Sequence, residues 1–209
     1  MKACGCIIGI IFSSALLVSC STSLISLNRA EMRKVETVGI MEFDTAPGVS
    51  KTIATECEEA FRGHFVGAEK KVVERSKLVS VLREIERSQS GVVSSYKKIG
   101  ELTAADALLF GTVTQNGEEV KWVEYFEYEK DPVTKEMIKI KKSKRKKFFT
   151  FQVQARLVST ESGSTIMTIK NEYPERSYEI TDSMTLTRCR EYTLEQMGKD
   201  LKKAIEKKD

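Results

Sequence analysis

Hydrophobic positions in the first half of the chain recur with strand and helix periods in turn. Residues 38–43 read as a strand, and Ser50 stands where it would cap a helix. The apolar positions after Ser50 keep a period of roughly 3.6 residues, and they are Ile53, Cys57, Ala60, Phe61 and Phe65. Further elements are predicted, in chain order, as a strand at 71–74, helices at 76–85 and 93–103, and a strand at 107–113. Helices and strands that alternate in this way are typical of an α/β domain.

Strands follow one another directly in the second half. An aromatic-rich strand at 120–129, a turn at 131–134 and a strand from 137 to 158 predict a long charged β-hairpin insert at about 115–148. Ser162-Gly163 forms a tight turn before a strand at 165–170. The last helix carries on one face Leu194, Met197, Leu201 and Ile205. We therefore expect a single, three-layer-like α/β domain over residues 35–209, with a mixed, partly antiparallel sheet flanked by helices.

The N-terminus has the layout of a bacterial lipoprotein signal. Lys2 precedes an apolar run over residues 7–18, and Ser19 directly precedes Cys20. The run is too short to cross a hydrocarbon core of ~30 Å as a helix. We expect cleavage to remove a signal peptide over residues 1–19, lipid to be attached to Cys20, and residues 20–34 to form a lipidated tether. The alternative is an ordinary secretory signal in which the cysteine stands by chance.

Acyl chains on Cys20 would anchor the protein to a membrane, because each buried methylene contributes roughly 0.8 kcal/mol and two or three chains hold stably. Ser21 fits the outer-membrane sorting rule of enteric bacteria, so the expected location is the outer membrane, facing the periplasm. After Cys20 no apolar run approaches the ~20 residues of a transmembrane helix. With 41% hydrophobic and 31% charged residues, the folded remainder is expected to lie in water.

Cys57 and Cys189 remain, beside Cys20, once the signal is removed. Export to an oxidising compartment permits a disulfide between them. Both also fall on the apolar faces of predicted helices, where a free cysteine behaves as a small hydrophobic side chain. Either state fits the sequence.

The predicted insert pairs an acidic strand with a basic strand. Its acidic residues are Glu118, Glu119, Glu124, Glu127, Glu129 and Asp131, and its basic residues are Lys139, Lys141, Lys142, Lys144, Arg145, Lys146 and Lys147. In a hairpin the charges would pair across the strands, each pair contributing about 0.2–1 kcal/mol. The sharper hypothesis is that surplus cations bind anionic headgroups, lipopolysaccharide or an acidic partner, at ~1 kcal/mol per cation near a membrane. Nucleic acid is not an expected ligand of an exported lipoprotein.

The acidic strand also carries Trp122, Tyr125, Phe126 and Tyr128, which occupy both of its faces. A two-stranded ribbon cannot bury both faces by itself. We expect one face to dock on the protein's own domain and the other on a partner. Trp122 and Tyr125 are candidate contacts with that partner or with headgroups.

Residues for catalysis or metal binding do not form a recognisable motif. His64 is the only histidine, and although Cys57 lies seven residues before it, no second pair completes a zinc set. No Gly-rich phosphate loop follows the first strand, and no Gly-x-Ser-x-Gly elbow occurs. We therefore expect no enzyme activity, no metal and no cofactor. A hydrolase acting on envelope polymer is the alternative from another class.

Several of these segments resemble the CsgG family of curli-secretion proteins. The resemblance is carried by Val38-Gly39-Ile40-Met41-Glu42-Phe43-Asp44, Val72-Val73-Glu74-Arg75-Ser76-Lys77-Leu78 and Ala105-Asp106-Ala107-Leu108-Leu109-Phe110-Gly111-Thr112-Val113. Order and spacing agree with the family over roughly residues 36–114 and 148–206. The resemblance implies a cell-envelope lipoprotein without catalytic residues. The chain is also distantly similar to LpoB-type lipoproteins, which activate a peptidoglycan synthase.

The family includes subunits of outer-membrane secretion channels, whose hairpins cross the membrane. Here the return strand of the insert, at 139–147, carries cations on both faces, each costing roughly 2–4 kcal/mol on the lipid side. A second hairpin is missing at 159–164, and the connection at 45–49 lacks the aromatic and asparagine side chains of the channel constriction. The resemblance therefore does not carry the pore function to this chain.

Together these observations predict a lipid-anchored, non-enzymatic envelope protein that acts through protein–protein contacts in envelope assembly or export. Its expected partners are the membrane, through the N-terminal lipid, other envelope proteins, and further copies of itself, since the family forms oligomers. The alternatives are a shortened secretion-channel subunit and a regulator of peptidoglycan synthesis.

Overall fold

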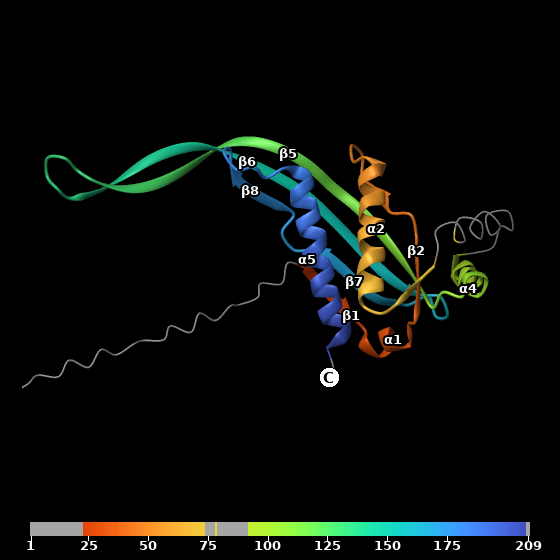
Figure 1. The fold of residues 1–209 in the computed structure, drawn as a ribbon. Helices are drawn as coiled ribbons and strands as arrows, with labels where there is room; N and C mark the ends of the chain where they lie inside the picture. The colour runs from red at the N-terminus through yellow and green to blue at the C-terminus, as the bar shows by residue number, and fades with distance from the viewer. Residues whose placement is uncertain (1–22, 74–77, 79–91, 208–209) are drawn as a thin grey trace, which may run out of the picture.

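Backbone pairing among the described residues builds an eight-stranded open sheet (Figure 1). The computed structural model describes residues 23–73, 78 and 92–207. The strands are β1 (Ser23–Leu27), β2 (Thr37–Ile40), β3 (Asp44–Thr45), β4 (Lys71–Val72), β5 (Ala107–Lys130), β6 (Met137–Ser159), β7 (Thr165–Asn171) and β8 (Glu175–Glu179). The helices are α1 (Arg29–Lys34), α2 (Lys51–Gly67), α4 (Val92–Thr103) and α5 (Leu186–Glu206). None of these helices combines the length and the apolar composition that crossing a membrane requires.

Parallel and antiparallel neighbours are mixed in the sheet. The strand order is β1-β7-β6-β5-β2-β4, with β3 beside β5 and β8 beside β6. β2 pairs parallel with β4 and β5, whereas β5, β6, β7 and β1 pair antiparallel in succession. The predicted α/β class and the mixed, partly antiparallel sheet are confirmed.

Side-chain caps start the two long helices. The Ser50 hydroxyl accepts a hydrogen bond from the Thr52 N–H at 3.2 Å, which places the start of α2 where the sequence predicts it. Thr185 caps α5 in the same way by accepting from the Arg188 N–H at 3.2 Å. Each cap satisfies a backbone donor that the first turn of the helix leaves free.

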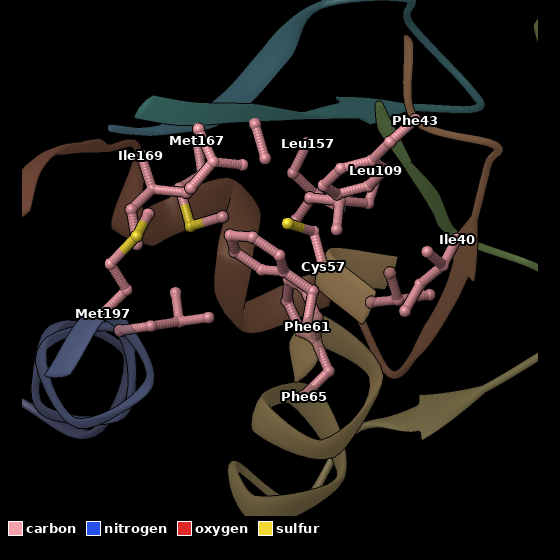
Figure 2. Close-up of a cluster of buried hydrophobic side chains, with 14 of the residues drawn as sticks. Ile40, Phe43, Cys57, Phe61, Phe65, Leu109, Leu157, Met167, Ile169 and Met197 are labelled. Atoms are coloured by element: carbon pink, nitrogen blue, oxygen red, sulfur yellow. The ribbon is translucent and has the colours of Figure 1, made fainter. Parts of the chain in front are cut away.

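The main hydrophobic core lies between these two helices and one face of the sheet. Phe61 and Phe65 of α2 and Met197 of α5 are fully buried, and Figure 2 shows them in one cluster with sheet residues such as Leu109, Leu157 and Ile169. Burying one such side chain stabilises the fold by roughly 1.5–3 kcal/mol. The apolar faces predicted for both helices are therefore confirmed.

The opposite face of the sheet is covered, within the described residues, only near β2. There Ile99 of α4 and Leu78 pack with Met41 and Leu108 in a second, smaller core. Three layers are present at this end of the sheet. Over β1, β7 and β6 the same face carries no helix from the described part of the chain (Figure 1).

Asp106 joins the starts of β2 and β5. Its carboxylate accepts hydrogen bonds from the N–H groups of Glu36 and Thr37, both at 2.8 Å. The Thr160 hydroxyl donates to the carbonyl oxygens of Ala105 and Asp106 at 2.8 and 2.9 Å. These bonds satisfy backbone groups at the end of the sheet, which explains a carboxylate directly before a buried strand.

Residues 23–34 differ from the predicted tether, because they form β1 and α1. β1 pairs antiparallel with β7, and Asn28 caps α1 by accepting from the Glu31 N–H. Ile25 and Leu27 pack against the main core. A strand this short shows too little alternation to be found alone, and its partner lies near the other end of the chain. Cys20, the signal and the helix predicted at 76–85, apart from Leu78, lie outside the described residues.

Asn171 closes the end of β7 against β6. Its Oδ1 accepts from the Val153 N–H at 2.9 Å, and its Nδ2 donates to the Phe151 carbonyl oxygen at 2.8 Å. The side chain is buried and lies opposite Ser23, where β1 begins. It thus replaces inter-strand backbone bonds at the point where β7 ends.

Replacing Asn171 by alanine should lower the free energy of unfolding by about 1–3 kcal/mol, because a backbone donor and acceptor of β6 lose their buried partner. Urea denaturation measures the difference. Lys170→Ala, at the exposed neighbouring position, is the control and should change stability by less than about 0.5 kcal/mol. Equal stability of the wild type and Asn171→Ala would contradict this role.

His64 packs between α2 and α5. Its ring meets Phe61 edge-on with the centroids 5.9 Å apart, and a Cβ added at Gly198 would come within 2.2 Å of the imidazole Nδ1. Burial lowers the pKa of His64 below its usual 6.5, and a hydrogen bond with the Leu194 backbone opposes that shift. The histidine is therefore a packed, neutral side chain at neutral pH.

Stability should fall as the pH drops below 6.5, because the unfolded chain protonates His64 there while the folded chain does not. Glu195, which lines a cleft with His64 between α2 and α5, titrates lower, since Lys199 holds its pKa below 4.5. His64→Gln should flatten this part of the stability curve in urea denaturation between about pH 5 and about pH 7.5. A variant with the same slope as the wild type would show that the cause lies elsewhere.

Candidate interaction surfaces

β5 and β6 remain paired far beyond the helices. Their register runs from Ala107 opposite Ser159 to Lys130 opposite Met137. From residue 120 in β5 and 147 in β6 outward, this pair projects away from α2 and α5, and residues 120–147 are called the ribbon below (Figure 1). The expectation that one ribbon face docks on the protein's own domain is therefore wrong for its outer part. In this part β5 and β6 extend beyond the helices α2 and α5.

The register separates the ribbon into two faces, because alternate residues of a strand point to opposite sides. One side, called the aromatic face, carries Val120, Trp122, Phe126 and Tyr128 of β5 opposite Lys147, Arg145, Lys141 and Lys139 of β6. Trp122 is 69% exposed, Phe126 57% and Tyr128 62%. In β6 this face continues the side on which Phe151 and Val153 are buried under the helices. The aromatic face is thus the continuation of the core face of the sheet beyond the part that α2 and α5 cover.

The other side, called the ion-pair face, carries the cross-strand salt bridges. Lys142 contacts the carboxylates of both Glu127 and Glu129, and these two partners raise its pKa above the usual value. Lys144 and Lys146 reach Glu179 of β8, with Nζ–Oε1 distances of 2.8 and 3.5 Å. The predicted pairing of opposite charges is confirmed here. Tyr125 also lies on this face, and the centroid of its ring is 5.1 Å from the Lys144 Nζ.

The other four residues of the predicted basic cluster lie on the aromatic face, and they are Lys139, Lys141, Arg145 and Lys147. The Lys139 Nζ stands 4.1 Å from the centroid of the Phe126 ring, and Lys141 pairs with Glu124 at 2.8 Å. Arg145 is exposed opposite Trp122, and neither it nor Lys139 forms an ion pair with any described residue. Lys147, at the base, donates to the carbonyl oxygens of Asp182 and Met184 at 2.6 and 3.3 Å. The structure thus divides the predicted basic cluster between the two faces.

A groove that the sequence did not reveal lies on the side of the sheet turned away from α2 and α5. Its volume is about 670 Å³. Two rows of cross-strand neighbours form it, Ser26-Thr168-Arg156-Phe110 and Leu24-Lys170-Gln154-Thr112. Leu24 is 57% exposed, and the Arg156 guanidinium lies 5.6 Å from the centroid of the Phe110 ring. The sequence signal that could have indicated this groove is the polar residue at every second position in parts of β6 and β7.

Cys57 and Cys189, the candidate disulfide pair, are both buried as free thiols in the structure. Cys57 belongs to the main core, where burial, with a smaller effect of Glu56, raises its pKa to about 12. The Cys189 Sγ accepts a hydrogen bond from the Tyr178 hydroxyl at 3.9 Å. The two thiols thus have separate surroundings on α2 and α5. A thiol kept protonated in this way is a poor nucleophile.

Groups of three or more His, Cys, Asp or Glu side chains able to hold a metal ion do not occur within residues 23–73, 78 and 92–207. His64 and Cys57, the pair noted in the sequence, both serve in packing.

Three solved structures match this chain over most of their own length. The PelC dodecamer of Paraburkholderia phytofirmans is 13% identical, with a TM-score of 0.46, over 90% of this chain and 99% of that chain. Protein CT253 of Chlamydia trachomatis is 8% identical, with a TM-score of 0.48, over 82% and 98%. Lipoprotein GNA1162 of Neisseria meningitidis is 14% identical, with a TM-score of 0.44, over 78% and 96%.

Among curated proteins, none matches this chain significantly. The sequence model of one family, described as "Curli production assembly/transport component CsgG", matches residues 65–207. That range is more than half of the chain and includes β5 to β8 and α5. The protein belongs to the CsgG family.

Proposed function

We propose that this protein is anchored to the outer membrane through lipid on Cys20, faces the periplasm, and acts in envelope assembly or export by contacting other proteins. It carries out no chemical step of its own. Membership of a family described as an assembly and transport component supports this role. The observation that carries it in the structure is the groove on the sheet face that, over β1, β7 and β6, no helix of the described residues covers.

The anchor would hold the domain close to the bilayer. Cys20 lies three residues before Ser23, the first residue of β1. Three residues span at most about 11 Å when fully extended. Lipid on Cys20 therefore keeps one edge of the sheet at the membrane surface, where the protein meets other envelope components.

The groove has the chemistry of a protein contact. Leu24 and Phe110 supply apolar surface, and Arg156 and Lys170 supply positive charge beside it. β1 forms the outer strand on this side and pairs, among the described strands, with β7 alone, so its second edge offers backbone groups to a partner. A segment with apolar and acidic side chains fits, from another envelope protein or from a second copy.

A shortened secretion-channel subunit is the second candidate, because the family description names transport. The ribbon favours the contact role. It carries Lys142 and Lys144 on one face and Lys139 and Lys141 on the other. Each would cost roughly 2–4 kcal/mol against lipid chains near the bilayer midplane.

Cys20→Ala should abolish incorporation of radioactive palmitate into the protein in growing cells, because the thiol that receives the lipid is gone. Cys57→Ala is the matched control and should keep the label, since that thiol is buried in the core. Labelled palmitate on Cys20→Ala would remove the basis of the proposed anchor.

Photocrosslinking in cells tests the contact role. A benzoylphenylalanine placed at position 24, in the groove, should give discrete adducts with an envelope protein or with a second copy. The same group at position 202, exposed on α5, should not give those adducts. Position 24 yielding no protein adduct would count against the groove as a contact surface.

A further inference from the structure

The ribbon leaves the sheet at the end where β1 begins. β6 runs from the ribbon into the sheet, and β1 has the same direction because both pair antiparallel with β7. Ser23 pairs with Asn171, whose side chain bonds the Val153 backbone. Arg145 of β6, which lies opposite Trp122, comes eight residues before Val153. Along the strand, Trp122 is therefore about 26 Å from the level of Ser23. The proposed lipid and the ribbon thus share one end of the molecule.

The aromatic face has the composition of a membrane interface. Trp and Tyr are enriched at the headgroup level of bilayers, where an apolar ring and a polar tip are both accommodated. Trp122, Phe126 and Tyr128 are all more than half exposed, at alternating positions of one strand. An apolar patch of this kind marks a contact site, because water disfavours it.

Charge differs between the two ribbon faces. On the ion-pair face the carboxylates of Glu127, Glu129 and Glu179 neutralise the lysines. On the aromatic face Lys139 and Arg145 form no ion pair with described residues, and Glu124 is engaged by Lys141. The surplus positive charge therefore stands beside the exposed aromatic rings. Each cation near an anionic membrane surface contributes about 1 kcal/mol.

We propose that the aromatic face of the ribbon lies on an anionic membrane surface, with Trp122, Phe126 and Tyr128 at the headgroup level and Lys139 and Arg145 on lipid phosphates. The proposal rests on the lipid anchor at Cys20, which brings the ribbon to the bilayer. The ion-pair face then remains in water.

A second copy is a poorer occupant of the same face. Two aromatic faces brought together would oppose cations to cations, and like charges directly opposite one another are destabilising. Glu124, the carboxylate on the aromatic face, is already held by Lys141, and Glu127, Glu129 and Glu179 lie on the ion-pair face with their own lysines. Anionic lipid supplies the missing counter-charge directly.

Trp122 is the only tryptophan of the chain, so it reports on this face alone. The intact lipoprotein is reconstituted in vesicles of phosphatidylcholine, or of phosphatidylcholine and phosphatidylglycerol in equal amounts, with bromine on the acyl chains as quencher. With phosphatidylglycerol we expect the emission to shift to shorter wavelength and to fall by roughly half, as for a ring at the interface. Raising the salt from about 0.1 M to about 1 M should weaken both effects, since the Debye length shortens from about 10 to about 3 Å.

A tryptophan moved to the ion-pair face is the matched control. Trp122→Phe combined with Tyr125→Trp keeps the aromatic content and the charge and should show neither blue shift nor quenching. Equal quenching at both positions, or no quenching of Trp122 with phosphatidylglycerol, would overturn the proposal. So would a Trp122 shift that appears without lipid and depends on protein concentration, because it would indicate a second copy.

Charge removal gives an independent check. Lys139→Gln with Arg145→Gln should reduce the quenching of Trp122. Lys144→Gln with Lys146→Gln removes the same charge from the ion-pair face and should leave the quenching of Trp122 unchanged. Flotation with pure phosphatidylcholine vesicles reports the lipid anchor separately. If the protein floats with phosphatidylcholine vesicles but phosphatidylglycerol produces no quenching of Trp122, the ribbon proposal is overturned and the lipid anchor stands. If Trp122 is quenched with phosphatidylglycerol but the protein does not float with pure phosphatidylcholine vesicles, the anchor is overturned and the contact of the ribbon with anionic lipid stands.

Discussion

The antiparallel pairing of β5 with β6 is the constraint on which the rest of the structure depends. The two strands stay hydrogen-bonded from Ala107 and Ser159 in the core to Lys130 and Met137 at the far end. In the core, β7 and β1 are added on the β6 side and β2 on the β5 side, and α2 and α5 cover the face they form. Core and ribbon are thus made of the same two strands.

One irregularity in this pair decides what the ribbon shows. The register shifts between Val113 and Gln115, so β5 gains one residue relative to β6. Before the shift the odd-numbered residues of β5, such as Leu109 and Val113, face the helices; after it the even-numbered ones do. Asn116, which accepts a hydrogen bond from Arg190 of α5, marks the change. Without the extra residue, the side chains of β5 in the ribbon would exchange faces, because strand alternation has a period of two.

Local patterns predicted the elements that bury their own apolar faces. Ser50 and the helical spacing of Phe61 and Phe65 located α2, and the run of apolar residues at 107–109 located the start of β5. β1 and α1 were missed because their stability comes from β7, far along the chain, and five residues of alternation carry little information.

Surfaces were harder to predict than elements. Alternation in the sequence already placed Tyr125 on the other face of the strand from Trp122 and Phe126. It could not show that the ribbon extends beyond α2 and α5, which leaves these rings exposed. The groove at Leu24 and Arg156 required the strand order, since its rows come from four strands. Which side chains share a surface depends on long-range pairing, and a single sequence does not display it.

The unbroken strands have a mechanical consequence. No hinge separates the ribbon from the sheet within β5 and β6, so a load on the turn at Asp131 is carried by the backbone ladder into the layer beneath α2 and α5. A force applied by a binding partner to the ribbon is therefore transmitted directly to the strands that line the main core.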